Sequence, residues 1–272
     1  MIDIQNSEDT REIPLQKVGI KDLKYPVTVL DRVNGNQQTT ATVNLFVNLP
    51  HNYKGTHMSR FIEIFHSHRE NLGMKNFLEM LEEIRKSLDA QKAFGSMTFP
   101  FFMEKKAPVS KSAGIMSYVC TYEGEVFLEK ENSSSFQKSE NFFIKIQIPI
   151  TTVCPCSKAI SDYGAHNQRG IVTVRLQNKS FFWIEDIIEL VEDCASNGLY
   201  SVLKRPDEKF VTEHAYNNPR FVEDVVREVY TALKNFSRCE KPFSSFSVEC
   251  ENFESIHNHN AYAFAEYNAE KS

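Results

Sequence analysis

The chain has 272 residues, of which 41% are hydrophobic and 25% are charged, and its formal net charge is −5. This length corresponds to about two domains of roughly 150 residues, which is enough for a full hydrophobic core. The negative charge argues against a nucleic-acid-binding surface. The sequence has no run of about 18 apolar residues, so no membrane span is predicted. The opening residues, MIDIQNSEDTREIP, lack the basic and apolar regions of a signal peptide, so we expect a cytoplasmic protein with no nucleic-acid or membrane partner.

In the first half, alternating residues predict strands in YPVTVLD (25–31) and QTTATVNLFVNL (38–49), joined by a turn containing Asn-Gly. Apolar residues at helical spacing then predict two helices, near Met58–His68 and near Lys75–Leu88. Strand patterns return in GIMSYVCTYEGEVFLEK (114–130). The Ser-rich segment ENSSSFQKSE (131–140) is predicted to be a hairpin loop or a linker.

The second half begins with strands in NFFIKIQIPI (141–150) and GIVTVRLQN (170–178). A helix is predicted from about Ser180, and a second helix from Asn218 as N-cap with Pro219 in its first turn. The last strands are FSVEC (246–250) and AYAFAEY (261–267). The apolar stripe of the second helix comprises Val222, Val225, Val226, Val229 and Leu233.

The element order is therefore strand-strand-helix-helix-strand-strand, and it occurs twice. This order predicts an α+β fold with two units, residues 1–135 and 136–272, each a four-stranded antiparallel sheet with two helices on one face. The other sheet face must also be covered, and a partner subunit would cover it.

Two polar clusters follow the strand that is predicted to end at Ile150. The first is Cys154-Pro-Cys156, where the proline is expected to keep the backbone extended. With six cysteines in a cytosolic chain, buried thiols and a ligand or nucleophile are both open interpretations. The second cluster is GAHNQR (164–169), and a loop can fold back to bring His166 to Cys154. Thiolate and imidazole together suit Zn²⁺.

A third cluster, SVLKRPDEKFVTE (201–213), is predicted to be an inter-helix loop because Pro206 interrupts the helical pattern. Lys204, Arg205 and Lys209 offer contacts to anions, and Asp207 and Glu208 offer oxygen ligands. A solvated charged loop is the ordinary alternative. Glu223 follows in the first turn of the next helix, where the helix dipole favours a carboxylate.

Two further clusters contain histidines. ENFESIHNH (251–259) lies at the predicted turn between the last two strands, and His257 with His259 offers acid–base chemistry near neutral pH. A polar hairpin is the alternative there. HNYKGTHMSR (51–60) precedes the first helix, whose N-terminus is suited to anions such as phosphates. A capped helix with a basic first turn is the commoner case.

Four motifs in this order carry a resemblance to a known family: GTHMSRFIEIF, CPCSKAISDYGAHNQRG, SVLKRPDEKFVTEHAYNNPRFVEDVVRE and ENFESIHNHNAYA. Together they resemble GTP cyclohydrolase I of type IB, a prokaryotic enzyme of the tunnelling-fold superfamily. The likeness runs from about residue 20 to the C-terminus. It implies two tandem tunnelling-fold modules that assemble into barrels, and a homotetramer with active sites at subunit interfaces.

The reaction implied by this resemblance is the hydrolysis of GTP to 7,8-dihydroneopterin triphosphate and formate, the first step towards folate. The resemblance implies a divalent metal, Zn²⁺ or Mn²⁺, held by residues among Cys154, His166, Glu208 and His257. It places Glu254 with His257 at the site and makes Cys154, Cys156, His257 and Glu254 the catalytic candidates. Glu223 corresponds to the acid that anchors the guanine. Lys204, Arg205, Arg60 and His57 are the candidates for the triphosphate contacts.

Two rival functions also match parts of this sequence. The nitrile reductase of queuosine synthesis shares the tunnelling fold and the glutamate, and uses a cysteine with NADPH and no metal. The combined CPC, GAHNQR and ESIHNH segments favour the cyclohydrolase. A zinc-stabilised interaction module without catalysis would unfold on metal removal, whereas a catalytic metal on a full-sized core would leave the fold intact.

Overall fold

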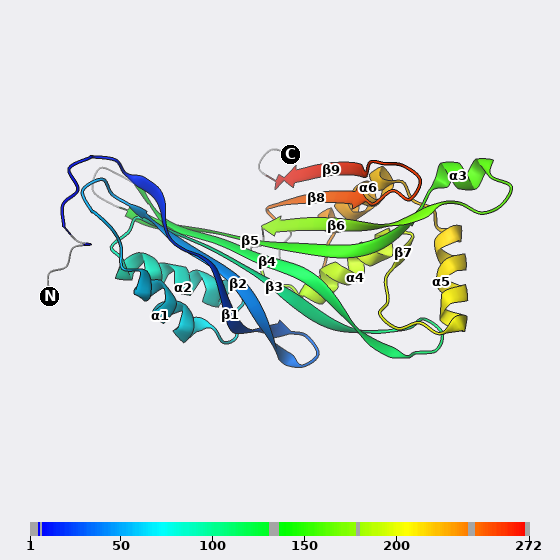
Figure 1. Cartoon of the computed structure of the whole chain (residues 1–272), viewed down its shortest axis with the longest axis horizontal. Coiled ribbons are helices and arrows are strands. Elements are labelled where there is room, and N and C mark those ends of the chain that lie inside the picture. The colour runs from blue at the N-terminus through cyan, green and yellow to red at the C-terminus, as the bar shows by residue number, and fades with distance from the viewer. Residues whose placement is uncertain (1–4, 6, 131–135, 178–179, 239–242, 270–272) are drawn as a thin grey trace. The chain divides into compact units, whose positions relative to one another are not determined.

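A computed structural model describes residues 5, 7–130, 136–177, 180–238 and 243–269 (Figure 1). The described residues form six helices and nine strands. None of these helices is long and apolar enough to cross a membrane. The elements are β1 (Leu15–Asp31), β2 (Gly35–Leu49), α1 (Met58–His68), α2 (Met74–Ser87), β3 (Lys92–Lys106), β4 (Ala113–Lys130), β5 (Phe136–Val153), α3 (Pro155–Ile160), β6 (Asn167–Gln177), α4 (Ile184–Cys194), β7 (Asn197–Gly198), α5 (Arg205–Asn217), α6 (Val222–Lys234), β8 (Ser245–Asn252) and β9 (Ala261–Asn268).

The strands are hydrogen-bonded in the order β1-β2-β3-β4-β5-β6-β8-β9, and the short β7 pairs with β5. The pairs β1–β2, β2–β3, β5–β7, β6–β8 and β8–β9 are antiparallel. An α+β fold is therefore confirmed, and the repeated β-β-α-α-β-β order is present with α3, β7 and α5 inserted in the second half.

The chain divides into two compact units. Unit 1 comprises Met1–Pro100 with Thr121–Ile144, and unit 2 comprises Phe101–Cys120 with Lys145–Ser272. The long strands β3, β4 and β5 contribute to both units. The predicted modules are residues 1–135 and 136–272. Their boundary follows residues 131–135, which lie outside the described residues, so it stays a prediction.

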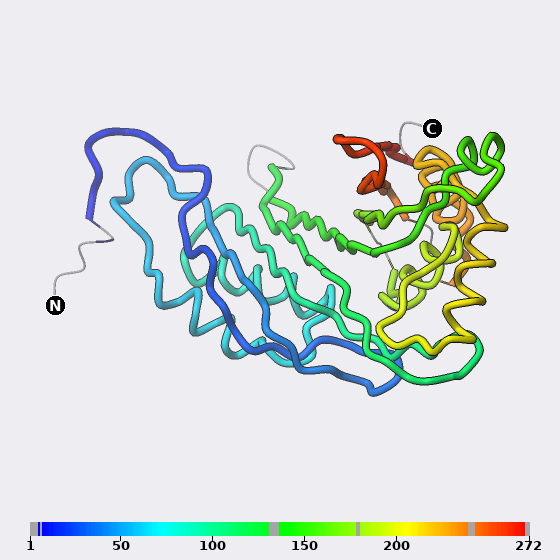
Figure 2. Tube along the Cα trace, turned by 45° about the vertical axis from the view of Figure 1, so that its right-hand side comes forward, coloured from blue at the N-terminus to red at the C-terminus, as the bar shows by residue number. Residues whose placement is uncertain are grey.

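Unit 1 contains the twisted β1–β2 hairpin, which Figure 2 shows in blue. The predicted alternation on β2 is confirmed, because Val43, Leu45, Val47 and Leu49 are all buried. Helix α1 extends over Met58–His68, as predicted, and buries Phe61, Ile64 and Phe65.

In unit 2, α4 and α6 pack against each other, and α6 also packs on β8 and β9. The predicted apolar stripe of α6 is buried. The helix begins later than expected, however: Phe221 is its N-cap, and the backbone N–H of Phe221 donates to the Asp224 carboxylate (3.0 Å). Asn218 instead ends α5, and its side chain donates to the Ala195 carbonyl (2.9 Å). The prediction of an N-cap at Asn218 is thus wrong, because a local Asp224 acceptor sets the start of α6.

Two further local predictions are wrong for a shared reason. Residues 155–160 form α3, and residues 205–217 form α5, where an extended segment and a loop were predicted. Each helix carries its proline, Pro155 or Pro206, in the first turn. Proline lacks an N–H that the first turn would leave unpaired anyway, so it begins these helices and does not interrupt them. Within the CPC segment, only Cys154, the residue before Pro155, is extended (φ −69°, ψ 118°).

The close packing of α2 on the sheet depends on two glycines in neighbouring strands. A Cβ atom built at Gly124 would lie 2.8 Å from Leu81 Cδ1 and 2.9 Å from Phe77 Cε1, and one at Gly95 would lie 2.8 Å from Leu81 Cδ2. Because Leu81 and Phe77 are fully buried, neither side chain has room to move.

We expect Gly124→Ala to overpack this contact and to lower the free energy of unfolding by about 1–3 kcal/mol, measured by denaturant unfolding. Gly55→Ala is the matched control, because its nearest neighbour is Gln5 Cγ at 3.7 Å. An unchanged midpoint of denaturant unfolding for Gly124→Ala would contradict the close contact of Gly124 with Leu81 and Phe77.

Candidate active site

The two cysteines of the CPC segment lie at the start of α3, directly after β5. Cys154 is the N-cap residue, is half-buried, and accepts a hydrogen bond at Sγ from the Ser157 amide (3.4 Å). Cys156 is exposed in the first turn of α3. A thiolate is stabilised by helix amides, so this position suits a ligand or a nucleophile.

Other described cysteines differ sharply from these two. Cys120, Cys194 and Cys250 are buried. Burial raises the pKa of the Cys194 and Cys250 thiols to about 12 and also raises the pKa of Cys120. Neutral, enclosed thiols are inert, so the reactive candidates are Cys154 and Cys156. Cys239 lies outside the described residues.

The loop after α3 folds back, as predicted, and brings His166 to Cys154. The Cys154 amide donates to the His166 carbonyl (3.1 Å), and the His166 amide donates to Ser157 Oγ (3.2 Å). Ser157 Oγ also donates to the Cys154 carbonyl (3.2 Å). The backbone of both predicted ligands is therefore fixed on one small framework.

The loop between β8 and β9 adds a carboxylate to this group. The Phe253 amide donates to the Arg169 carbonyl (2.8 Å), which holds the loop against the start of β6. Glu254 Oε2 then lies 3.9 Å from His166 Nδ1. This carboxylate oxygen is buried and has no hydrogen-bond partner within the described part of the chain. A buried carboxylate oxygen without a partner is costly, and a cation at this point would remove the cost.

The other two predicted ligands, Glu208 and His257, have no described contact with Cys154, His166 or Glu254. Glu208 is exposed in the first turn of α5. His257 is exposed and stacks on His259, with ring centroids 5.2 Å apart and planes 17° from parallel. Within the described ranges, no three His, Cys, Asp or Glu side chains form a ready-made metal cluster. The thiol, imidazole and unsatisfied carboxylate of Cys154, His166 and Glu254 nevertheless suit a divalent metal in their chemistry.

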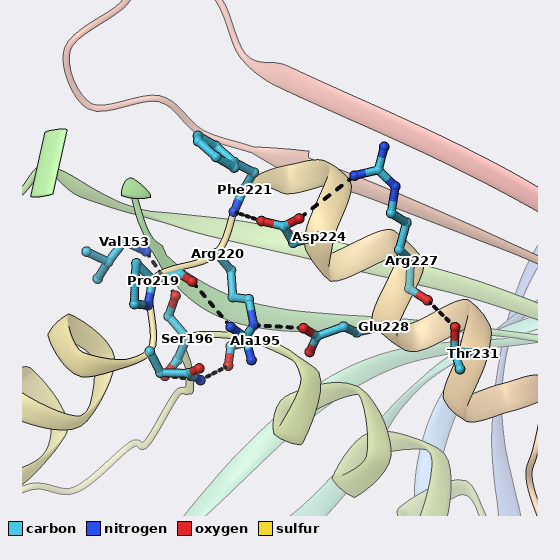
Figure 3. A network of polar contacts seen from close by, with 11 residues as sticks. Val153, Ala195, Ser196, Pro219, Arg220, Phe221, Asp224, Arg227, Glu228 and Thr231 are labelled. Atoms are coloured by element: carbon cyan, nitrogen blue, oxygen red, sulfur yellow. Dashed lines mark hydrogen bonds and ion pairs between the residues drawn. The ribbon is translucent and has the colours of Figure 1, made fainter. Parts of the chain in front are cut away.

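Three contacts tie the flanking helices to this framework. The Lys158 ammonium group on α3 donates to the Tyr216 carbonyl at the end of α5. The Arg220 amide donates to the Val153 carbonyl (3.0 Å), one residue before Cys154, and Arg220 Nε lies 3.2 Å from Glu228 Oε1 (Figure 3). Glu223, the predicted guanine anchor, is exposed in the first turn of α6, three residues after Arg220.

The candidates for the triphosphate lie at two helix N-termini. Lys204 and Arg205 are exposed at the start of α5 in unit 2. His57 and Arg60 lie at the start of α1 in unit 1, where they line a surface pocket of about 190 Å³. Arg60 NH1 donates to the Ser87 carbonyl (2.6 Å).

Asp207, an oxygen-ligand candidate in the sequence, has a structural role that was not predicted from the sequence pattern. Asp207 is fully buried and accepts hydrogen bonds from the backbone amides of Val109, Ser110 and Lys204 (2.8, 2.8 and 2.9 Å) and from Ser110 Oγ (2.6 Å). Burial alone would raise its pKa, but these hydrogen bonds outweigh burial and hold the pKa of Asp207 well below its usual range. Asp207 thus anchors the first turn of α5, which carries Glu208. The spacing of Asp207, three residues after the N-cap Lys204, was the sequence signal that could have indicated this capping role.

The family of the chain follows from comparison with known proteins. The fold is that of urate oxidase: the Bacillus subtilis 168 enzyme matches 94% of this chain and 100% of its own, with a TM-score of 0.54 and 7% identity. A family model described as type I GTP cyclohydrolase folE2 matches residues 1–263. The GTP cyclohydrolase FolE2 of Syntrophus aciditrophicus is 52% identical over 98% of this chain and 99% of its own. That of Geobacter sulfurreducens is 48% identical over the full length of both. The chain therefore belongs to the type I GTP cyclohydrolase FolE2 family.

We expect Asp207→Asn to lower the melting temperature at neutral pH, because an amide offers its NH2 group to donors that need an acceptor. A carboxylate with a lowered folded-state pKa stabilises the fold above its unfolded pKa of about 3.9, and this contribution is lost as the pH falls below that value. The difference in melting temperature between wild type and Asp207→Asn should therefore narrow from pH 7 to pH 3.

The matched control is Asp193→Asn, which lies on α4 and shows no such set of hydrogen bonds among the described contacts. Thermal unfolding followed by circular dichroism at both pH values gives the comparison. A difference that widens towards pH 3 would contradict the assignment.

Proposed function

We propose that the chain hydrolyses GTP to 7,8-dihydroneopterin triphosphate and formate at a divalent metal site built around Cys154 and His166. Membership of the FolE2 family makes the chain a hydrolase that acts on GTP in the first step of folate biosynthesis. The observation that carries the proposed location is the buried, unsatisfied Glu254 oxygen 3.9 Å from His166 Nδ1, beside Cys154.

Cys154, His166, Glu208 and His257 would hold the metal, which would be Zn²⁺ or Mn²⁺. When bound, such a metal lowers the pKa of water from about 15.7 towards 7 and so supplies the nucleophile for purine C8. The metal-binding residues come from the start of α3, the start of β6, the start of α5 and the β8–β9 loop. Glu208 and His257 are exposed, and the proposal requires their side chains to turn towards Cys154 and His166.

The other candidate residues would move protons and hold GTP. His257 and Glu254 would transfer protons to and from the purine nitrogens, and Cys156 would serve the later ring-closing steps. Glu223 would accept two N–H groups of the guanine edge, which excludes adenine. Lys204, Arg205, Arg60 and His57 would bind the triphosphate through charge and helix N-termini.

We further propose two tandem tunnelling-fold modules and a homotetramer with active sites at subunit interfaces. Exposed apolar side chains on the strands support this arrangement, among them Phe102, Ile115, Val119, Tyr262 and Phe264. Exposed apolar side chains are costly in water, and a second subunit would cover them.

Metal removal tests the site directly. We expect chelator-treated protein to keep its circular dichroism spectrum and to lose formate and pterin production, with activity restored by Mn²⁺ or Zn²⁺. His166→Gln should bind less metal and lose activity by about 10²-fold or more, whereas the control His66→Gln, an exposed histidine on α1 in unit 1, should retain both. Unfolding on metal removal would instead indicate a structural zinc module.

The guanine assignment has a separate test. We expect Glu223→Gln to raise KM for GTP by about 10²-fold or more, because two hydrogen bonds to a charged acceptor contribute roughly 1.5–3 kcal/mol each. Glu213→Gln, an exposed glutamate on α5, is the control. An unchanged KM for Glu223→Gln in steady-state kinetics would refute the assignment.

A further inference from the structure

Resting on the proposed metal site, we propose that Gln168 is a positioning residue that sets the tautomer of His166. Gln168 holds the imidazole with its proton on Nδ1, so that the lone pair is on Nε2 and available to a divalent metal. Gln168 itself does not touch metal or substrate.

A short chain of hydrogen bonds carries this inference. Gln168 is buried, with 7% of its surface exposed, and lies one residue into β6. Its Nε2 donates to Thr152 Oγ1 (2.8 Å) on the neighbouring strand β5, and Thr152 is fully buried. Its Oε1 lies 3.0 Å from His166 Nδ1. With its amide oxygen facing the ring, Gln168 can only accept at this point, so this hydrogen bond requires a proton on His166 Nδ1.

Glu254 favours the same tautomer independently. Its buried Oε2 lies 3.9 Å from the same ring nitrogen. Two acceptors, an amide oxygen and a carboxylate oxygen, therefore face Nδ1, and a lone pair at Nδ1 would be repelled by both. A proton at Nδ1 removes this repulsion, while Glu254 Oε2, at 3.9 Å, lies beyond hydrogen-bond distance and stays available to a cation.

The backbone leaves the ring little other freedom. The His166 carbonyl accepts from the Cys154 amide, and the His166 amide donates to Ser157 Oγ. With the main chain held at both groups, the orientation of the imidazole depends on its side-chain torsions, and the bond to Gln168 fixes these. Histidines that bind metals commonly donate their second ring N–H to such an acceptor, which orients the ring and raises its basicity.

The direct test is nuclear magnetic resonance of the metal-free, full-length protein with ¹⁵N-labelled histidine. Long-range ¹H–¹⁵N correlations distinguish the two tautomers at about pH 8.5, two units above the ordinary histidine pKa. The His166 signals are identified by their absence in His166→Gln. We expect the Nδ1–H tautomer in the wild type; an Nε2–H tautomer there overturns the proposal without recourse to any variant.

Two variants separate positioning from packing. Gln168→Met keeps the length of the side chain but removes the acceptor, and it should shift His166 towards the Nε2–H tautomer. Gln168→Glu keeps an acceptor and should retain Nδ1–H. The control is Gln177→Met at the far end of β6. An Nδ1–H tautomer that persists in Gln168→Met overturns the proposal.

Metal affinity is then measured for the same proteins by competition with a chromophoric Zn²⁺ chelator. We expect Gln168→Met to weaken Zn²⁺ binding by about 10–100-fold and Gln168→Glu to bind at least as tightly as the wild type. A wild type that binds no metal would defeat the proposed metal site, while the tautomer measurement would still decide the role of Gln168. Equal affinity in wild type and Gln168→Met would overturn the link between tautomer and metal.

Discussion

The hydrogen bond from the Cys154 amide to the His166 carbonyl is the constraint on which the candidate site depends. Helix α3 has only six residues, too few to be stable by itself, so the position of the CPC segment depends on contacts outside the helix. This hydrogen bond closes the intervening loop, Ser157 strengthens the closure, and Lys158 attaches α3 to the end of α5. A thiol, an imidazole and, through the β8–β9 loop, a carboxylate then share one region of unit 2.

The candidate site residues fall into two sets that differ in burial. Cys154, His166 and Glu254 are partly or largely buried, whereas Glu208, Glu223 and His257 are exposed. Asp207 and Arg220 nevertheless fix the backbone beside Glu208 and Glu223 through bonds to neighbouring segments. In the candidate site, hydrogen bonds hold the backbone around Cys154 and His166, whereas the exposed Glu208 and Glu223 lie in first helical turns and His257 lies in the β8–β9 loop.

The likeness to urate oxidase concerns the fold and not the function. A protein that is 7% identical has the same fold over 94% of this chain, so the fold alone does not specify the chemistry. The family follows instead from FolE2 relatives that are about half identical to this chain over nearly its full length, and the candidate site residues lie at strand ends, helix starts and loops. Such positions can vary in chemistry because they contribute little to the core.

Much of this protein is determined locally by its sequence. Helix α1, the buried faces of β2 and β5 and the stripe of α6 follow from apolar spacing, because burial of a regular face needs only that spacing. The motifs likewise indicated the family and brought Cys154 and His166 together as candidates. Tertiary structure alone decided that Asp207 anchors a distant loop and that Gln168 faces His166. Each of these depends on hydrogen bonds to partners brought close only by the folded backbone, which periodicity along the chain does not encode.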